Sequence, residues 1–122
     1  MNQLRPVIIV ENDPSIREAF RMFLECEGFP VAVAENGQQG LEFILSYGGN
    51  CVVLLDLQMP LMTGQELLEI LSKDENPAIR SAPVLVMTAK NENFEHPGII
   101  GTLRKPFDLD HLRNRLQTLC RA

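Results

Sequence analysis

The sequence predicts an α/β fold: a five-stranded parallel sheet with helices on both faces. Two observations lead to this prediction. Five short apolar runs recur along the 122 residues, and most are followed by a segment with apolar residues at helical spacing. Strands that alternate with helices are joined by right-handed crossovers, which place helices on both faces of a parallel sheet. A chain of this length buries one core, so we expect a single domain over residues 1–122.

The first strand and helix are predicted within residues 7–28. Val7 to Val10 is a continuous apolar run, as in a strand buried on both faces. Asp13 and Pro14 then supply an N-cap and a first-turn proline, and Gly28 can end the helix in the left-handed conformation. The helix residues expected in the core are Ile16, Ala19, Phe20, Phe23 and Leu24.

A second helix lies between the next two strands. Val31 to Ala34 is the second strand, and a helix follows Asn36-Gly37 and ends at Gly48-Gly49. The third strand runs from Cys51 to Asp56, an apolar run that closes on a carboxylate. The apolar stripe of the helix includes Leu41, Ile44 and Leu45.

The third helix begins at Thr63, which forms a capping box with Glu66, and its pattern continues until Asn76-Pro77 breaks it. The fourth strand is Pro83 to Met87. The helix residues expected to face the core are Leu67, Leu68 and Leu71.

Residues 90–98 carry the weakest helical pattern, because they include two asparagines, a proline and a glycine. We expect a fourth helix here that is short or irregular. Ile99 to Leu103 forms the fifth strand, and Asp108 caps the last helix. The apolar face of that helix consists of Leu109, Leu112, Leu116 and Leu119.

The composition argues against several classes of protein. Eleven basic against sixteen acidic residues give a net charge of −5, which argues against a nucleic-acid surface. No stretch approaches the roughly 20 apolar residues of a membrane span, and residues 1–6 lack the layout of a secretory signal. We therefore expect a cytoplasmic protein without a membrane segment. The cysteines are expected as reduced thiols and the histidines as isolated side chains rather than zinc ligands: Cys26, Cys51, Cys120, His96 and His111.

Polar residues follow the strands at their carboxyl ends, where open α/β sheets hold their chemistry. Asp56 is a candidate nucleophile there, although an aspartate that only starts a turn also fits the segment. A carboxylate attacks a phosphoryl group only when the negative charges are offset, as by Mg²⁺ and a lysine, and a hydroxyl can bind a phosphoryl oxygen. The residues expected to share this pocket are Glu11, Asn12, Asp13, Asp56, Thr88 and Lys105.

Four segments together resemble the receiver domains of the two-component response-regulator family, and the resemblance covers essentially the full chain. They are the acidic cluster at 11–13, the Asp-x-x-Met-Pro-x-Met-x-Gly pattern of residues 56–64, Thr88-Ala89, and Lys105-Pro106-Phe107. The resemblance implies a flavodoxin-like fold. It also implies a signalling domain that catalyses only its own phosphorylation and dephosphorylation, rather than an enzyme that turns over a substrate.

The resemblance implies a role for each site residue. Asp56 would accept a phosphoryl group from the phosphohistidine of a histidine kinase or phosphotransfer protein. Thr88 would be the switch hydroxyl, and Lys105, placed inward by Pro106-Phe107, would contact the phosphoryl group. Phosphorylation would then change the affinity for a downstream protein or output domain. The implied Mg²⁺ ligands are Glu11, Asn12, Asp56 and the backbone carbonyl of Gln58.

Asn12 departs from the family pattern, which usually has two acids after the first strand. It takes the position that ordinarily binds the metal directly, and its neutral amide keeps one oxygen donor but removes a charge. At an effective dielectric of about 20, that charge is worth up to ~4 kcal/mol at about 4 Å before desolvation is subtracted. We therefore expect weak Mg²⁺ binding. Asp13 could partly substitute, but its position before Pro14 favours helix capping.

The residues that the family uses to pass on its signal also depart from the family pattern. Thr102 stands three positions before Lys105, where the family often has an aromatic residue, so coupling through an aromatic rotamer is excluded. The interval from Thr88 to Lys105 is several residues shorter than usual, which argues against the standard dimer through the fourth-helix face. By the resemblance, Gln58 and Lys90 lie where family members tune the approach of the hydrolytic water, although solvent-facing side chains near the pocket fit both residues equally well.

One other function stays open, and the sequence argues against a third. A degenerate receiver, which binds partners without phosphorylation, is favoured by Asn12, Thr102 and the short fourth helix. A small flavodoxin-like or nucleotide-binding enzyme would need a phosphate-cradling loop after the first strand, but residues 11–14 are acidic and lack glycine. The residues that favour the phosphoacceptor are Asp56, Thr88 and Lys105.

Overall fold

The computed structural model describes residues 4–57, 62–88, 99–104 and 108–121. Its strands are β1 (Val7–Val10), β2 (Val31–Ala34), β3 (Val52–Asp56), β4 (Val84–Thr88) and β5 (Ile99–Arg104). They form one five-stranded sheet in the order β2-β1-β3-β4-β5, with every neighbouring pair parallel. This arrangement confirms the predicted α/β fold.

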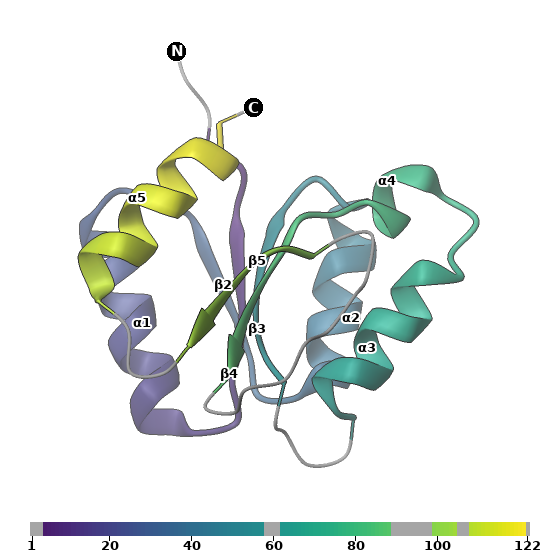
Figure 1. Cartoon of the computed structure of the whole chain (residues 1–122), viewed down its shortest axis with the longest axis horizontal. Helices are drawn as coiled ribbons and strands as arrows, with labels where there is room; N and C mark the ends of the chain where they lie inside the picture. The colour runs from purple at the N-terminus through teal and green to yellow at the C-terminus, as the bar shows by residue number, and fades with distance from the viewer. Residues whose placement is uncertain (1–3, 58–61, 89–98, 105–107, 122) are drawn as a thin grey trace.

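Helices lie on both faces of the sheet (Figure 1). One face is covered by α1 (Pro14–Cys26) and α5 (Leu109–Leu119), and the other by α2 (Gly37–Ser46) and α3 (Gly64–Ser72). A short helix, α4 (Pro77–Arg80), follows α3 on that second side. None of the helices in these described ranges has the length and apolar character needed to cross a bilayer.

The core has two layers, because successive residues of a strand point to opposite faces of the sheet. In β1, Ile8 and Val10 belong to the layer under α2 and α3, whereas Val7 and Ile9 belong to the layer under α1 and α5. All residues of β1, β3 and β4 are buried, as their continuous apolar runs predicted. The sheet is therefore held from both sides, with its three central strands fixed in register.

Most helix ends follow the predicted signals. The side chains of Asp13, Asn36, Thr63 and Asp108 each accept a backbone N–H in the first turn of the following helix. Gly28 follows α1 with a φ of +92°, the left-handed conformation that glycine adopts without penalty. These caps confirm the starts of four helices and the end of the first.

Three residues expected in the core are instead exposed. Leu45 is 46% exposed, Leu109 is 38% exposed, and Ala19 also faces solvent. Ala19 stands one position from the buried Phe20 of α1, and Leu45 one position from the buried Ile44 of α2. Leu109 is the first residue of α5. The prediction was wrong at the edges of the helical faces and correct at their centres.

The segment after α3 also differs from the prediction. α3 ends at Ser72, and Asn76-Pro77, expected only to break a helix, begins α4. The Asn76 side chain accepts the Ala78 N–H at 3.0 Å, because Asn followed by Pro suits an N-cap as well as a helix end. β3 and β4 each begin one residue later than predicted. The expected short fourth helix, at residues 90–98, lies outside the described residues and is not α4.

Candidate functional site

The buried polar or charged residues of the described chain gather at one edge of the sheet. They are Glu11, Asp56 and Thr88, which are 1%, 5% and 2% exposed. Each stands at the carboxyl end of one of the three central strands, β1, β3 and β4. Because burial of polar groups costs free energy that apolar residues would avoid, their presence at this edge indicates a site rather than packing.

The strand register places Asp56 between the other two. Val10 pairs with Leu55, so Glu11 follows alongside Asp56. Asp56 pairs with Met87, and the Leu57 N–H donates to the Met87 carbonyl at 3.2 Å, so Thr88 comes one position further on the other side. Since neighbouring strands lie about 4.8 Å apart, Glu11 and Asp56 stand on adjacent strand ends, and Thr88 ends the strand on the other side of Asp56.

Gly64 fixes the loop that leaves Asp56. Its N–H donates to the Leu57 carbonyl at 3.2 Å, which closes the loop at its base. A Cβ on Gly64 would lie 2.8 Å from the Leu57 Cα and 3.0 Å from the Asp56 carbonyl oxygen. The α3 N-terminus therefore packs directly on the Asp56 backbone, and only a residue without a side chain fits there. The sequence pattern contained Gly64, but its contact with Asp56 follows only from the fold.

The corner between β1 and α1 holds Glu11 in place. The Asp13 N–H lies 3.3 Å from a Glu11 carboxylate oxygen, and the Arg17 guanidinium donates to the Glu11 main-chain carbonyl at 3.0 Å. The Asp13 carboxylate accepts the Ser15 and Ile16 N–H groups at 2.9 and 3.2 Å, so it caps α1 as predicted. Asn12, between them, is exposed.

The donors at this corner suit Mg²⁺ better than a softer ion. Mg²⁺ is commonly held by one or two carboxylates together with carbonyl oxygens and waters, whereas zinc favours nitrogen and sulfur. Glu11 and Asp56 supply two buried carboxylates on adjacent strands. Across the described part of the chain, no three His, Cys, Asp or Glu side chains are grouped to share an ion. The predicted side-chain ligand set thus has two carboxylates, with the neutral amide of Asn12 as its third member.

The remaining predicted site residues fall partly outside the described ranges. Gln58, Lys90 and Lys105 are among the residues whose positions are not described. Thr88 pairs with Arg104, so β5 ends beside the site one residue before Lys105. Thr102 lies on β5, is exposed, and pairs with Val86.

One residue near the site was missed from the sequence. Arg17 stands in the first turn of α1, and its bond to the Glu11 carbonyl brings a cation to the acidic corner. The only signal in the sequence was its position four residues after the capping Asp13, one helical turn into the helix. Such spacing is common in helices and does not identify a partner on the preceding strand.

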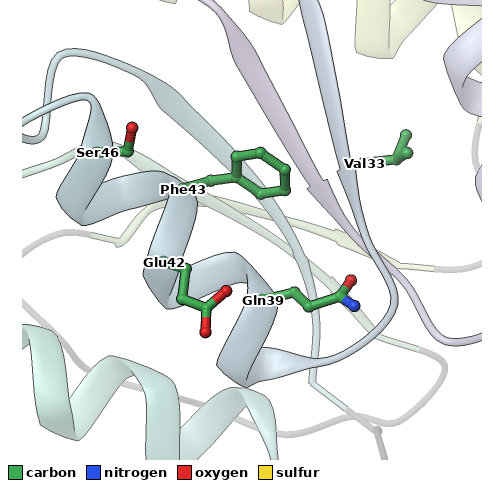
Figure 2. Close-up of a pocket in the computed structure, with 5 residues that line it drawn as sticks. All are labelled: Val33, Gln39, Glu42, Phe43 and Ser46. Carbon is green, nitrogen blue, oxygen red and sulfur yellow. The ribbon is translucent and has the colours of Figure 1, made fainter.

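A separate hollow lies away from this edge. It has a volume of about 450 Å³ and is lined by residues of β2 and α2: Val33, Gln39, Glu42, Phe43 and Ser46 (Figure 2). The side-chain amide oxygen of Gln39 already accepts the Glu35 N–H at 2.9 Å. None of the five lining residues belongs to the buried polar group, so the hollow adds nothing to the candidate site.

Comparisons with known proteins identify the family. The family model for the response regulator receiver domain matches residues 7–117. The probable transcriptional regulator ycf29 of Pyropia yezoensis is 34% identical over 118 residues, which cover 93% of this chain and 52% of that protein. The chain spans about half the length of the curated relatives it matches.

Solved structures of receiver domains share the fold. The chemotaxis protein CheY4 of Vibrio cholerae aligns with a TM-score of 0.79 at 25% identity, covering 96% of this chain and 99% of that chain. The receiver domain of sensor histidine kinase PA1611 from Pseudomonas aeruginosa, solved with a magnesium ion in its active site cleft, aligns with a TM-score of 0.77 at 21% identity, covering 97% and 98%. With the family model matched over residues 7–117, this chain belongs to the response regulator receiver domain family of two-component systems.

Proposed function

We propose that this receiver domain is a phosphoacceptor in a two-component phosphorelay and that Asp56 is the residue phosphorylated. The observation that supports the proposal is the burial of Glu11, Asp56 and Thr88 side by side at the carboxyl ends of neighbouring strands. A turn aspartate with no further role would not need two buried polar neighbours, since an exposed position would cost less free energy.

In the proposed reaction, a carboxylate oxygen of Asp56 attacks the phosphorus atom of a phosphohistidine on a histidine kinase or phosphotransfer protein. A P–O bond forms as the P–N bond breaks, and the electron pair of the broken bond stays on the imidazole nitrogen. The product is an acyl phosphate on Asp56. The same attack on acetyl phosphate releases acetate, which allows the reaction to be tested without the kinase.

Mg²⁺ would be held by the carboxylates of Glu11 and Asp56, the amide oxygen of Asn12 and the main-chain carbonyl of Gln58. When bound, it would offset the repulsion between the carboxylate and the phosphoryl oxygens. The chain's own contribution is to hold two carboxylates close together on fixed strand ends, where each is buried before the ion arrives. With Asn12 neutral, we expect Mg²⁺ to bind weakly.

The switch would begin at Thr88. After phosphorylation its hydroxyl donates a hydrogen bond to a phosphoryl oxygen, and the Lys105 ammonium pairs with the same group. These contacts would favour a second state of the domain with a different affinity for a downstream protein or an output domain. Several curated relatives of about twice this length are named as transcriptional regulators, which is consistent with an output domain that acts on genes.

A second function is a degenerate receiver that binds its partner without phosphorylation. The observation that favours it is Asn12, whose exposed amide replaces the acid expected beside Glu11. Asp56 and Thr88 would then be retained for packing and hydrogen bonding alone.

Labelling with acetyl phosphate separates the two functions. The domain is incubated with acetyl phosphate across a Mg²⁺ titration, and intact mass spectrometry detects the added phosphoryl group. We expect a single adduct whose yield rises with Mg²⁺ and which is absent in Asp56→Asn. Lack of any adduct at the highest Mg²⁺ concentration would favour the degenerate receiver. An adduct that persists in Asp56→Asn would place the phosphoryl group elsewhere.

A further inference from the structure

Arg17 brings a positive charge to the most acidic part of the candidate site. It is the fourth residue of α1, and the backbone N–H of Arg17 begins the helix by donating to the Asp13 carbonyl at 2.9 Å. Its side chain turns back toward β1, where Nη1 donates to the Glu11 carbonyl at 3.0 Å. The guanidinium is therefore one hydrogen bond away from the residue whose carboxylate lies beside Asp56.

Two of the carboxylates at this corner are buried on adjacent strand ends, those of Glu11 and Asp56. The Asp13 carboxylate is exposed and accepts two N–H groups of α1. Two adjacent carboxylates repel each other, and either a metal ion or a protein cation relieves that repulsion. Arg17 is a resident cation on the Glu11 side, and Asn12 carries no charge there.

We propose that Arg17 determines the Mg²⁺ affinity of this receiver domain. Its guanidinium partly offsets the charge of Glu11 and Asp56 and repels an approaching Mg²⁺ ion. Two residues then weaken the binding of the ion: Asn12, which is neutral, and Arg17, which is positive. The inference rests on the proposed function, since it concerns the ion that the phosphorylation reaction would use. The inference names a second cause of weak Mg²⁺ binding. The first is the missing ligand charge at Asn12, and the second is the repulsion between Arg17 and the ion.

The test is a calorimetric titration of Mg²⁺ into the unphosphorylated domain, without any phosphodonor. Arg17→Gln removes the charge and keeps an N–H donor, whereas Arg17→Lys keeps the charge. We expect Arg17→Gln to bind Mg²⁺ about three- to tenfold more tightly at low salt, and the gain to shrink as salt screens the charge. Arg17→Lys should stay within about twofold of the unmodified domain, since it preserves the charge.

Arg21 offers a matched control on the same helix. It lies one turn further along and pairs with Glu18 and Glu25 on the exposed side of α1. Arg21→Gln changes the net charge of the domain by the same amount, but away from Glu11. It should leave the Mg²⁺ affinity within about twofold at the same salt concentration, because exposed charges are well screened. Should Arg17→Gln unfold the domain, Arg17→Met keeps the apolar stem and serves the same purpose.

Two results would overturn the inference. Mg²⁺ affinity that is unchanged or weaker in Arg17→Gln would mean that Arg17 only holds the Glu11 backbone. An equal gain in Arg21→Gln would mean that net charge, not position, sets the affinity. Failure of the proposed function looks different: no acyl phosphate forms on the unmodified domain at any Mg²⁺ concentration. If the inference alone fails, labelling persists and Arg17→Gln has the same Mg²⁺ dependence as the unmodified domain.

Discussion

Asp56 stands between two buried polar residues on the adjacent strands. Glu11 follows β1 on one side of it and Thr88 ends β4 on the other, and all three are buried. From the sequence, each of these residues could be predicted to follow a strand, because the strands were clear apolar runs. That Asp56 lies between the other two depends on the strand order, which places β3 between β1 and β4.

Asn12→Asp should strengthen Mg²⁺ binding. The substitution restores a carboxylate next to Glu11, and the added charge should raise the affinity by about tenfold or more at low salt. Calorimetric titration of Mg²⁺ measures the change. The same variant should be less stable without Mg²⁺, because a third carboxylate joins the two on adjacent strand ends. An affinity equal to that of the unmodified domain would mean that residue 12 does not reach the ion.

The cysteines test the packing of the core. Burial raises the pKa of the Cys51 thiol to about 11 and that of the Cys120 thiol to about 12, whereas Cys26 is exposed. Iodoacetamide at pH 8 should therefore modify only Cys26 in the folded domain and all three cysteines in urea, as counted by intact mass. Modification of Cys51 or Cys120 at the rate of Cys26 in the folded domain would contradict the buried positions.

The same thiols give the stability a pH dependence. Their pKa values are higher in the folded domain than the ordinary value of about 9, so the folded state holds these protons more tightly than the unfolded chain. This stabilisation is complete below pH 9 and is lost as the pH rises toward 11 to 12. The free energy of unfolding should fall over that range in urea titrations, and the fall should be smaller in Cys120→Ala.

At the scale of elements, the sequence predicted where helices begin better than how they continue. Asp13, Thr63 and Asp108 cap helices as expected, because a short polar side chain before an apolar stripe has one favourable use. Asn76-Pro77 was ambiguous, since the same pair can end one helix or start another. The width of the buried stripes could not be predicted, because it depends on how closely each helix approaches the sheet.

Gly64→Ala should disturb Asp56 through the loop between β3 and α3. The added Cβ would lie 2.8 Å from the Leu57 Cα, so the backbone must shift, at a cost of about 1–3 kcal/mol in the free energy of unfolding. We expect acetyl phosphate labelling of Asp56 to slow by about tenfold or more, since small displacements of a nucleophile are costly. Urea unfolding and the rate of mass gain measure the two effects.

Gly48→Ala is the control for this prediction. Gly48 has a φ of +62° and open space around its Cβ position, so alanine there costs about 1–2 kcal/mol from backbone strain alone. The two variants should lose comparable stability, but only Gly64→Ala should slow labelling. Equal labelling rates in both would mean that the contact of Gly64 with Asp56 has no effect on the site.

At the scale of the whole molecule, the candidate site and the described chain ends lie at opposite ends of the sheet. Leu4 pairs with Arg121, and the Arg5 N–H donates to the Cys120 carbonyl at 2.6 Å, beside the start of β1. Asp56, the last residue of β3, lies at the other end of the sheet, one position beyond the pairing of Val10 with Leu55. The sheet and the two layers of the core lie between Asp56 and the described ends, so any change at Asp56 that reached those ends would pass through them.

The central claim, that Asp56 is phosphorylated, is tested most directly by locating the acyl phosphate. The domain is treated with acetyl phosphate and Mg²⁺ and reduced with borohydride, which converts an aspartyl phosphate into homoserine. Peptide mass spectrometry then finds the modified residue. We predict homoserine at position 56 and at no other aspartate, with the signal lost when Mg²⁺ is removed by a chelator. Homoserine at another aspartate, such as Asp13, with Asp56 unchanged would contradict the claim.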